Sequence, residues 1–298
     1  MKLKQIAALA IDKGNFTNLK GYVEFCEIYL DYIAENLQAV IVSQNENHYR
    51  FYQYDKSGNF QITRPINSNL MYDAKGFAKS GKEFLKILKH VKDVGAKDAD
   101  ARKVLNNATY TIQQTIGSAL DALPAGKSNT ARKLNGDLFE HFIRLILRET
   151  GVDAMSGVVQ IPVEIKGEET FNMGYQHDLI LKTDGEIKVI GSIKTSSKDR
   201  IDKVFMDKFV YNLLTKKSIP HIAIFLHDVQ RKNTKKKNVY GINATFLPGH
   251  FKCYTVKLNP LDGVYYCDIR PNMRTEHILK DHIKTFDHLL CEDIWKFI

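Results

Sequence analysis

The stretch Gln176–Lys198, QHDLILKTDGEIKVIGSIKTSSK, predicts two short strands joined by a tight turn. Asp178–Lys182 is rich in residues that favour strands, and it ends at the turn signal Thr183–Gly185. Glu186–Lys194 then alternates between two faces, as a strand with one covered side does. Because the turn is short, we expect the two strands to be antiparallel neighbours.

The second strand carries the side chains that suggest chemistry. We expect Ser192 and Lys194 to share a face with Lys188 and Ile190, opposite a face formed by Ile187, Val189, Gly191 and Ile193. Antiparallel pairing brings Asp178 near Ser192 and Lys194. A carboxylate can hold Mg²⁺, which acidifies bound water, and an ammonium can stabilise charge that develops on a phosphate. An ordinary ion pair across a hairpin would give the same pattern.

The spacing Asp178-x₁₃-Ser192-Ile193-Lys194 resembles the PD-(D/E)xK nuclease signature, in the variant in which serine replaces the second acid. The resemblance covers residues 130–227 and is closest to type II restriction endonucleases. It implies that Asp178 binds Mg²⁺ and that Lys194 orients or helps to activate the attacking water. The sequence departs from the family at His177, where proline is common, and at Ser192, which removes a metal-binding carboxylate.

The order of predicted elements agrees with this resemblance. Thr130–Glu149 and Ile201–Thr215 have apolar residues at helical spacing, and Val158–Val163 and Ile219–Leu226 read as strands. The succession αβββαβ predicts an α/β (α+β) fold with a mixed central sheet, a restriction-endonuclease-like core and flanking helices. In the second helix, Asp199 is the expected N-cap, and one apolar side is expected to hold Phe205, Phe209, Val210, Leu213 and Leu214.

Three acids outside the motif are candidates to replace the carboxylate that Ser192 lacks. Glu140 lies in the helix before the sheet, where related nucleases often place an accessory carboxylate. Asp202 lies on the apolar side of the following helix, although its first-turn position also suits the helix dipole. Asp207 lies near the position at which the serine-variant group carries a compensating acid, or it pairs with a lysine. We therefore expect the metal ligands among Asp178, Glu140, Asp202 and Asp207.

The charge balance is compatible with a nucleic-acid partner. The chain has 43 Lys and Arg against 34 Asp and Glu, a net charge of +9 that attracts polyanions. The strongest basic run, Gln230–Asn238, is predicted to be a loop between two strands, and a solvated loop is its plainer interpretation. The residues expected to contact DNA are Lys198, Arg200, Lys203, Arg231, Lys232, Lys235, Lys236 and Lys237.

The rest of the chain is expected to divide at the loop Leu123–Asn129, although one continuous domain would fit as well. Residues 1–125 are predicted to be mostly helical, with helices at Tyr22–Leu37, Ala74–Val91 and Ala99–Leu120 and a hairpin of Tyr49–Tyr54 with Phe60–Arg64. Residues 126–298 would hold the core and a β-rich C-terminal extension, with strands at Val239–Phe246, Cys253–Leu258 and Val264–Ile269 and a helix at Glu276–Leu290.

Several other classes of protein are disfavoured. The four cysteines are scattered without a CxxC pair, so neither a zinc site nor a disulfide framework is expected, and a reducing cytoplasm is favoured. The apolar run Ile6–Ile11 is too short for a secretory signal, and no stretch approaches the ~20 apolar residues of a membrane helix. Gly126-Lys127-Ser128 lacks the preceding strand and first glycine of a P-loop.

The sequence therefore predicts a Mg²⁺-dependent, sequence-specific endonuclease that cuts double-stranded DNA in a bacterial or archaeal cytoplasm. A homodimer is expected, because two sites related by a twofold axis can cut both strands of a symmetric sequence. A repair or junction nuclease would use the same site on another substrate. A DNA-binding protein with a degenerate nuclease fold is the third possibility, and Ser192 is the feature that supports it.

Overall fold

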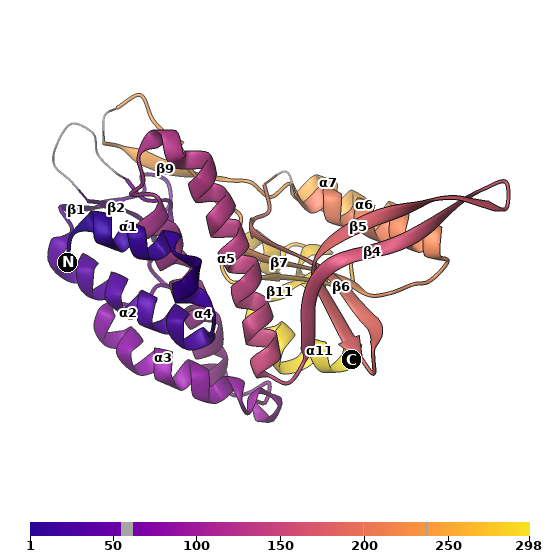
Figure 1. Ribbon diagram of the computed structural model, residues 1–298. Helices are drawn as coiled ribbons and strands as arrows, with labels where there is room; N and C mark the ends of the chain where they lie inside the picture. The colour runs from indigo at the N-terminus through magenta and orange to yellow at the C-terminus, as the bar shows by residue number, and fades with distance from the viewer. Residues whose placement is uncertain (55–61, 199, 237) are drawn as a thin grey trace.

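In the computed structural model, which describes residues 1–54, 62–198, 200–236 and 238–298, a mixed six-stranded sheet organises the chain (Figure 1). Its strand order is β11-β10-β7-β6-β5-β4. The antiparallel part consists of β4 (Asp153–Ile165), β5 (Glu168–Thr183) and β6 (Glu186–Ser196). The parallel part continues from β6 through β7 (His221–His227), β10 (Gly263–Tyr266) and β11 (Ile283–Thr285).

The predicted succession αβββαβ is confirmed. Helix α5 (Ser128–Glu149) precedes β4, β5 and β6, and α6 (Ile201–Thr215) connects β6 to the parallel strand β7. The turn between β5 and β6 places Asp184 and Gly185 at positive φ, a conformation that glycine adopts without strain. The central sheet, with helices on its two faces, is therefore the mixed α/β architecture that the sequence predicts.

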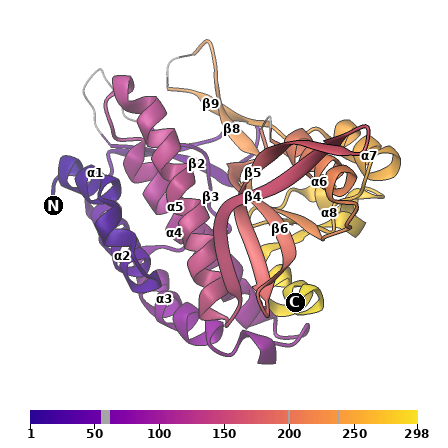
Figure 2. The same ribbon diagram turned by 45° about the vertical axis from the view of Figure 1, so that its right-hand side comes forward.

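The N-terminal third forms a layer of helices beside the sheet. It contains α1 (Leu3–Ile11), α2 (Leu19–Asn36), α3 (Ala74–Leu88) and α4 (Ala99–Leu120), with short 3₁₀ helices at Lys13–Phe16, Val91–Asp93 and Ala125–Lys127. The side chains of Asn18, Asp73 and Asp98 cap α2, α3 and α4. Helix α5 lies between this layer and the sheet (Figure 2). One set of buried side chains extends from Ile6 to Ile294 through both parts.

The strand predicted at Tyr49–Tyr54 is present as β2 (Tyr49–Gln53), but its observed partners are other segments. It pairs with β1 (Ala39–Val42) and β3 (Ile66–Asn67) in a small separate sheet. Of the predicted second strand Phe60–Arg64, Ile62 makes an isolated antiparallel bridge to Gln53. The predicted turn, Asp55–Asn59, lies outside the described residues.

Two predictions for the C-terminal third are wrong. Cys253–Leu258 is not a strand but falls on α7 (Pro248–Lys257), because Pro248 favours a first helical turn and Phe251 and Thr255 are buried at helical spacing. Glu276–Leu290 is not one helix, since Ile283–Thr285 instead pairs with the edge of β10. Around it lie α8 (Pro271–Thr275), α9 (Leu279–His282), α10 (Phe286–His288), a π-helical turn (Leu289–Asp293) and α11 (Ile294–Phe297).

The basic run Gln230–Asn238 is not entirely a loop. It begins within β8 (Val229–Asn233), which pairs with β9 (Tyr240–Ala244) in a hairpin. Because β9 falls inside the predicted strand Val239–Phe246, that prediction is confirmed apart from its ends. Lys237 lies outside the described residues.

Helix α6 is rotated relative to the prediction. It buries Ile201, Val204, Phe205, Lys208 and Tyr211, and it leaves Phe209 and Leu213 39% and 64% exposed. The burial of Lys208 explains the rotation, because its ammonium donates hydrogen bonds to the carbonyl of Pro260 (2.6 Å) and to Asp262 (2.7 Å). The predicted N-cap, Asp199, lies outside the described residues.

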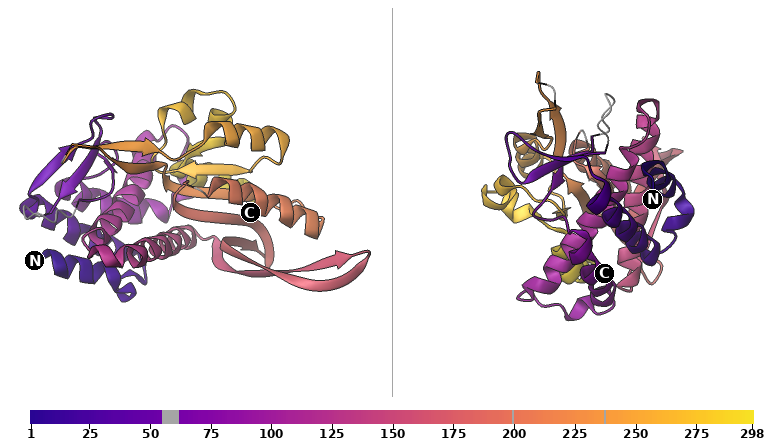
Figure 3. Two further views of the ribbon diagram at one scale, coloured as in Figure 1. Left: turned by 90° about the horizontal axis from the view of Figure 1, so that it is seen from above. Right: turned by 90° about the vertical axis from the view of Figure 1, so that its left-hand side faces the viewer.

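Strands β4 and β5 extend beyond the sheet. Because β6 pairs with β5 only from Leu179 to Thr183, the rest of the β4–β5 hairpin projects from the body as a two-stranded arm (Figure 3).

Among the described residues, no helix is both long and apolar enough to cross a membrane.

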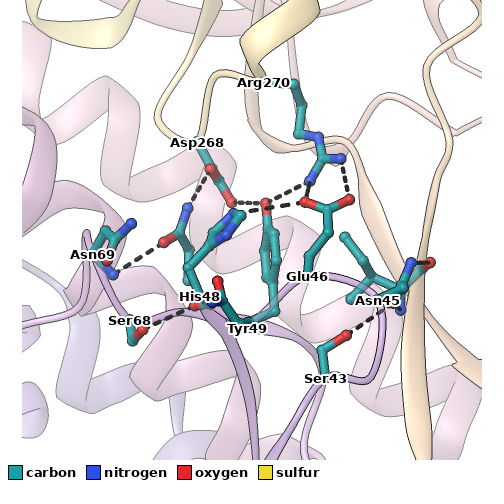
Figure 4. Close-up of polar contacts among 12 residues, drawn as sticks. Ser43, Asn45, Glu46, His48, Tyr49, Ser68, Asn69, Asp268 and Arg270 are labelled. Atoms are coloured by element: carbon teal, nitrogen blue, oxygen red, sulfur yellow. Dashed lines mark hydrogen bonds and ion pairs between the residues drawn. The ribbon is translucent and has the colours of Figure 1, made fainter.

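A buried polar network connects the small sheet to the ends of β7 and β10 (Figure 4). Asp268 accepts hydrogen bonds from the hydroxyl of Tyr49 and from Asn67, both at 2.8 Å. Arg270 donates to Glu46 at 2.7 Å, and its Nε lies 3.7 Å from Asp228 Oδ1. Burial raises the pKa of Asp228 to about 7, with Asp268 and Glu46 acting in the same direction and Arg270 against it.

We predict that Asp228→Asn stabilises the protein at neutral pH. The folded-state pKa of Asp228 lies above the unfolded value of 3.8, so the folded protein binds this proton more tightly and the contribution of Asp228 to stability falls as pH rises from about 4 to about 7. Thermal unfolding should show a gain for Asp228→Asn that grows over this range and then stays constant, at about 2–4 °C for each kcal/mol. Asp281→Asn, at an exposed position, is the control. A gain that is equal at pH 4 and pH 8 would contradict this assignment.

Candidate active site

The central strands β5 and β6 separate at Asp178. Their pairing runs from Thr183↔Glu186 to Leu179↔Gly191 and stops there, while β5 continues only against β4. Asp178 is the next residue of β5, and its Oδ2 accepts a hydrogen bond from the backbone N–H of Ile193 at 3.0 Å. The carboxylate thus replaces a main-chain acceptor where the two strands diverge. We call the opening between β5 and β6 at Asp178 and Ile193 the fork.

A β-bulge directs Asp178 into the fork. On β4, Met155 pairs with Ile180 and Gly157 pairs with His177. The one β4 residue in between, Ser156, therefore faces two residues of β5, Asp178 and Leu179. The extra residue changes which side chains face which side of the sheet. Leu179 packs in the core that includes α5, whereas the His177 ring lies 6.4 Å from that of Tyr211 on α6.

The fork brings three of the predicted site residues together. Lys194 Nζ lies 2.5 Å from Asp178 Oδ2 and 2.9 Å from Glu140 Oε1. Glu140 comes from α5 and Lys194 from β6, so three separate elements contribute. The side chains of Lys194, Glu140 and Asp178 are 30%, 24% and 17% exposed, so the cluster is shielded but can be reached from solvent.

The charges in the fork perturb one another. Burial raises the pKa of Glu140, and the Asp178 carboxylate raises it further, against the opposing effect of Lys194 and Arg144. Burial alone would lower the pKa of Lys194, but Asp178 and Glu140 outweigh it, so this pKa lies above its usual value. Lys194 is therefore protonated near neutral pH, and the two carboxylates compete for its single positive charge.

The donor set fits a magnesium ion. Among the described residues, no group of three or more His, Cys, Asp or Glu side chains could hold a metal ion. Mg²⁺ does not need such a group, because it commonly binds through one or two carboxylates and completes its shell with water and phosphate oxygens. Asp178 and Glu140 supply those carboxylates, and the raised pKa of Glu140 indicates that added positive charge would stabilise the pair.

The other predicted acids lie apart from this cluster. Asp202 is exposed, 3.9 Å from His250, and Asp207 is held by Lys203 at 2.6 Å. Ser192 is half-buried on β6 opposite Ala223 of β7, two residues before Lys194. Of the three candidate replacements for a carboxylate at Ser192, the structure thus places only Glu140 beside Asp178 and Lys194.

The residues predicted to contact DNA lie at the end of β6, on α6 and on the β8–β9 hairpin. Lys198 donates to Gln230 at 3.1 Å, which connects the end of β6 to the β8–β9 hairpin. Arg231 donates to the carbonyl of Ile62 at 2.9 Å, so it holds the hairpin against another segment. Of the predicted DNA-contact residues, those that lie in the described part of the chain are all exposed: Lys198, Arg200, Lys203, Arg231, Lys232, Lys235 and Lys236.

Sequence reasoning did not identify Arg144. Its Nη1 donates a hydrogen bond to the main-chain carbonyl of Asp178 at 2.9 Å. Arg144 follows Glu140 by four residues on α5, so the two side chains share a helix face. The four-residue spacing from Glu140 is the sequence feature that could have identified Arg144. It indicates a role at the site only when α5 is known to lie beside the fork.

No family model matches this chain, and no curated protein matches it in sequence. Among solved structures, the crystal structure of the type IIP restriction endonuclease Kpn2I is similar, with a TM-score of 0.72. The similarity covers 99% of this chain and 97% of that one at 19% sequence identity. The chain has a restriction-endonuclease-like fold. At this identity, the similarity concerns the fold alone.

We predict that a divalent cation can take over the role of the Lys194 charge. Lys194→Met leaves two partly buried carboxylates facing each other and should destabilise the protein by about 1–3 kcal/mol. Millimolar Mg²⁺ should then raise the melting temperature of the variant more than that of the wild type, because it binds the folded state. Lys188→Met, which removes the exposed Lys188–Glu186 pair, is the control. A variant that is insensitive to Mg²⁺ would argue against a metal site at Asp178 and Glu140.

Proposed function

We propose that this protein is a Mg²⁺-dependent endonuclease that hydrolyses phosphodiester bonds of double-stranded DNA at a specific sequence, as a type II restriction enzyme does. The observation that carries the proposal is the convergence of Asp178, Glu140 and Lys194 at the fork. The fold shared with a type IIP restriction endonuclease supports it. The Asp178-x₁₃-Ser192-Ile193-Lys194 spacing, which resembles the serine variant of the PD-(D/E)xK signature, also supports it.

In this proposal, two residues of the fork bind the metal ion and a third donates hydrogen bonds. Mg²⁺, when bound, supplies positive charge against the phosphate and acidifies water. Asp178 and Glu140 are the two carboxylates that would hold it, one fixed by the Ile193 N–H and the other presented by α5. Because Lys194 is protonated, its ammonium would donate hydrogen bonds to a phosphate oxygen or orient the attacking water, and it would not accept a proton.

The partner that we propose is duplex DNA, bound by a homodimer. The exposed lysines of the β8–β9 hairpin, joined to the end of β6 through Lys198 and Gln230, suit contacts to a phosphate backbone. Two copies related by a twofold axis would place one fork at each strand of a symmetric site. Helix α6, which follows the fork, exposes Met206, Phe209 and Leu213, an apolar surface that a second copy could cover.

The serine at position 192 is the observation that favours a DNA-binding protein without nuclease activity. Ser192 contributes no carboxylate, so a protein that binds DNA without cutting it would also be consistent with the fold. The placement of Glu140 beside Lys194 argues for the enzyme, because a second carboxylate is retained on another element. A nuclease that acts on branched or damaged DNA would use the same fork on another substrate.

We predict that the protein converts plasmid DNA to discrete fragments when Mg²⁺ is added. Asp178→Asn and Glu140→Gln should each slow cleavage by on the order of 10²–10³-fold or more, because each removes a carboxylate ligand. Asp202→Asn and Asp207→Asn should cleave at near wild-type rates, since both acids lie apart from the cluster. Circular dichroism would verify that the variants are folded.

The same assay separates the alternative functions. Preferred cleavage of branched DNA would indicate a junction nuclease. Binding without cleavage in either Mg²⁺ or Mn²⁺ would indicate the degenerate, DNA-binding protein. A protein that neither binds nor cuts DNA would contradict the whole proposal.

We predict that the hairpin lysines set part of the salt dependence of DNA binding. Each phosphate contact contributes about 0.9 to the slope of log K against log[salt], so changing Lys232, Lys235 and Lys236 together to Gln should reduce the slope by up to about 2.7. Binding of a 30-bp duplex would be followed by fluorescence anisotropy in EDTA. A variant with Lys4, Lys217 and Lys257 changed to Gln removes the same charge from scattered exposed positions. Equal slopes for the two variants would exclude the hairpin as a DNA contact.

A further inference from the structure

The bulge in β5 interrupts the regular pairing with β4 beside the fork. At a bulge the ladder is locally disrupted, and the extra residue lacks the regular main-chain partner. Here two residues of β5, Asp178 and Leu179, face a single residue of β4. The main-chain carbonyl of Asp178 accepts a hydrogen bond from Arg144 Nη1 at 2.9 Å, so α5 supplies a hydrogen-bond donor at the bulge.

The contact joins the two elements that present the carboxylates. Arg144 lies one helical turn after Glu140, and its guanidinium interacts electrostatically with both Glu140 and Asp178. Burial lowers the pKa of Arg144, although arginine remains charged in proteins. The hydrogen bond is therefore charge-assisted and lies in a shielded environment, which makes it a strong restraint on one position of the chain.

We propose that Arg144 is a positioning residue that locks the β5 bulge and so aims the Asp178 carboxylate into the fork. Asp178 is then held at two points: Arg144 fixes its main-chain carbonyl, and the Ile193 N–H fixes its side-chain Oδ2. Through its own helix, the same arginine sets the distance between Asp178 and Glu140. Arg144 acts on the metal ligands and has no direct role in the chemistry. The functional part of this inference rests on the proposed nuclease activity, whereas the restraint itself does not.

The next turn of α5 provides a matched control. Arg148 lies four residues after Arg144, and its Nε donates to the main-chain carbonyl of Ala154 on β4 at 2.7 Å. Both contacts therefore join α5 to a strand carbonyl through a guanidinium. Ala154 pairs with Leu181, in the regular part of the ladder beyond the bulge. Arg148 is more exposed than Arg144, so loss of its contact should cost no more stability, and it should leave Asp178 in place.

Amide hydrogen exchange tests the restraint without any need for catalysis. The Ile193 N–H reports on Asp178 directly, because its acceptor is Asp178 Oδ2. In Arg144→Gln, exchange at Ile193 should accelerate by about 10- to 100-fold relative to wild type, as expected for loss of one charge-assisted hydrogen bond. In Arg148→Gln, exchange at Ile193 should match the wild type after correction for global stability. Arg144→Lys, which keeps a cationic donor, should restore part of the protection and remains available if Arg144→Gln does not fold.

Cleavage kinetics test the functional consequence. Arg144→Gln should raise the Mg²⁺ concentration for half-maximal single-turnover cleavage by about tenfold or more and leave the DNA dissociation constant in EDTA unchanged. Arg148→Gln should change neither quantity. Weaker DNA binding by Arg144→Gln with normal Ile193 protection would overturn the inference and make Arg144 a DNA contact. Equal exchange at Ile193 in Arg144→Gln and Arg148→Gln would also overturn it. If the wild type cuts no DNA but Arg144→Gln still exposes Ile193, the restraint stands and the proposed nuclease function fails.

Discussion

The hydrogen bond from the Ile193 N–H to the Asp178 carboxylate is the contact on which the site depends. It ends the β5–β6 ladder with a side chain in place of a main-chain carbonyl, so the strands separate immediately beyond it. The separation leaves room for Lys194, the next residue of β6, to reach both Asp178 and Glu140. Without the bulge at Asp178, strand alternation would direct this carboxylate to the face opposite Leu179, away from α5.

The charges around the fork explain how Ser192 is compatible with a metal site. Two carboxylates, Asp178 and Glu140, face two cations, Lys194 and Arg144, so the cluster is balanced before any ion binds. Burial raises the pKa of Glu140 and the neighbouring Asp178 carboxylate raises it further, so the two carboxylates repel each other in a shielded environment. A third carboxylate at position 192 would add to that repulsion. The serine therefore leaves Glu140 as the second carboxylate, supplied by a helix instead of by β6.

The sequence predicted most of the core, because the core elements are decided by local patterns. Periodicity gave α4 and α6 their observed bounds, and the short turn at Gly185 gave the pairing of β5 with β6. The features that the sequence did not predict correctly depend on residues that are far away in the chain. The bulge leaves no mark on an alternating pattern, the rotation of α6 requires Asp262 to satisfy Lys208, and β11 forms only because β10 offers a free edge. For the same reason Glu140 could be named only as one of three acids.

Helix α5 makes the geometry of the site depend on the N-terminal helices. One side of α5 presents Glu140 and Arg144 to the fork, while Leu138, Phe139 and Phe142 are buried in the core shared with α1–α4. Tyr22 of α2 donates to the carbonyl of Leu138 at 2.8 Å and stacks on Phe142 at 4.6 Å between ring centroids. A shift of α2 would therefore move α5 and, with it, Glu140 relative to Asp178. Residues 121–127 separate α4 from α5 along the chain, but the buried core continues across them, and the helical layer contributes to the position of the Glu140 carboxylate.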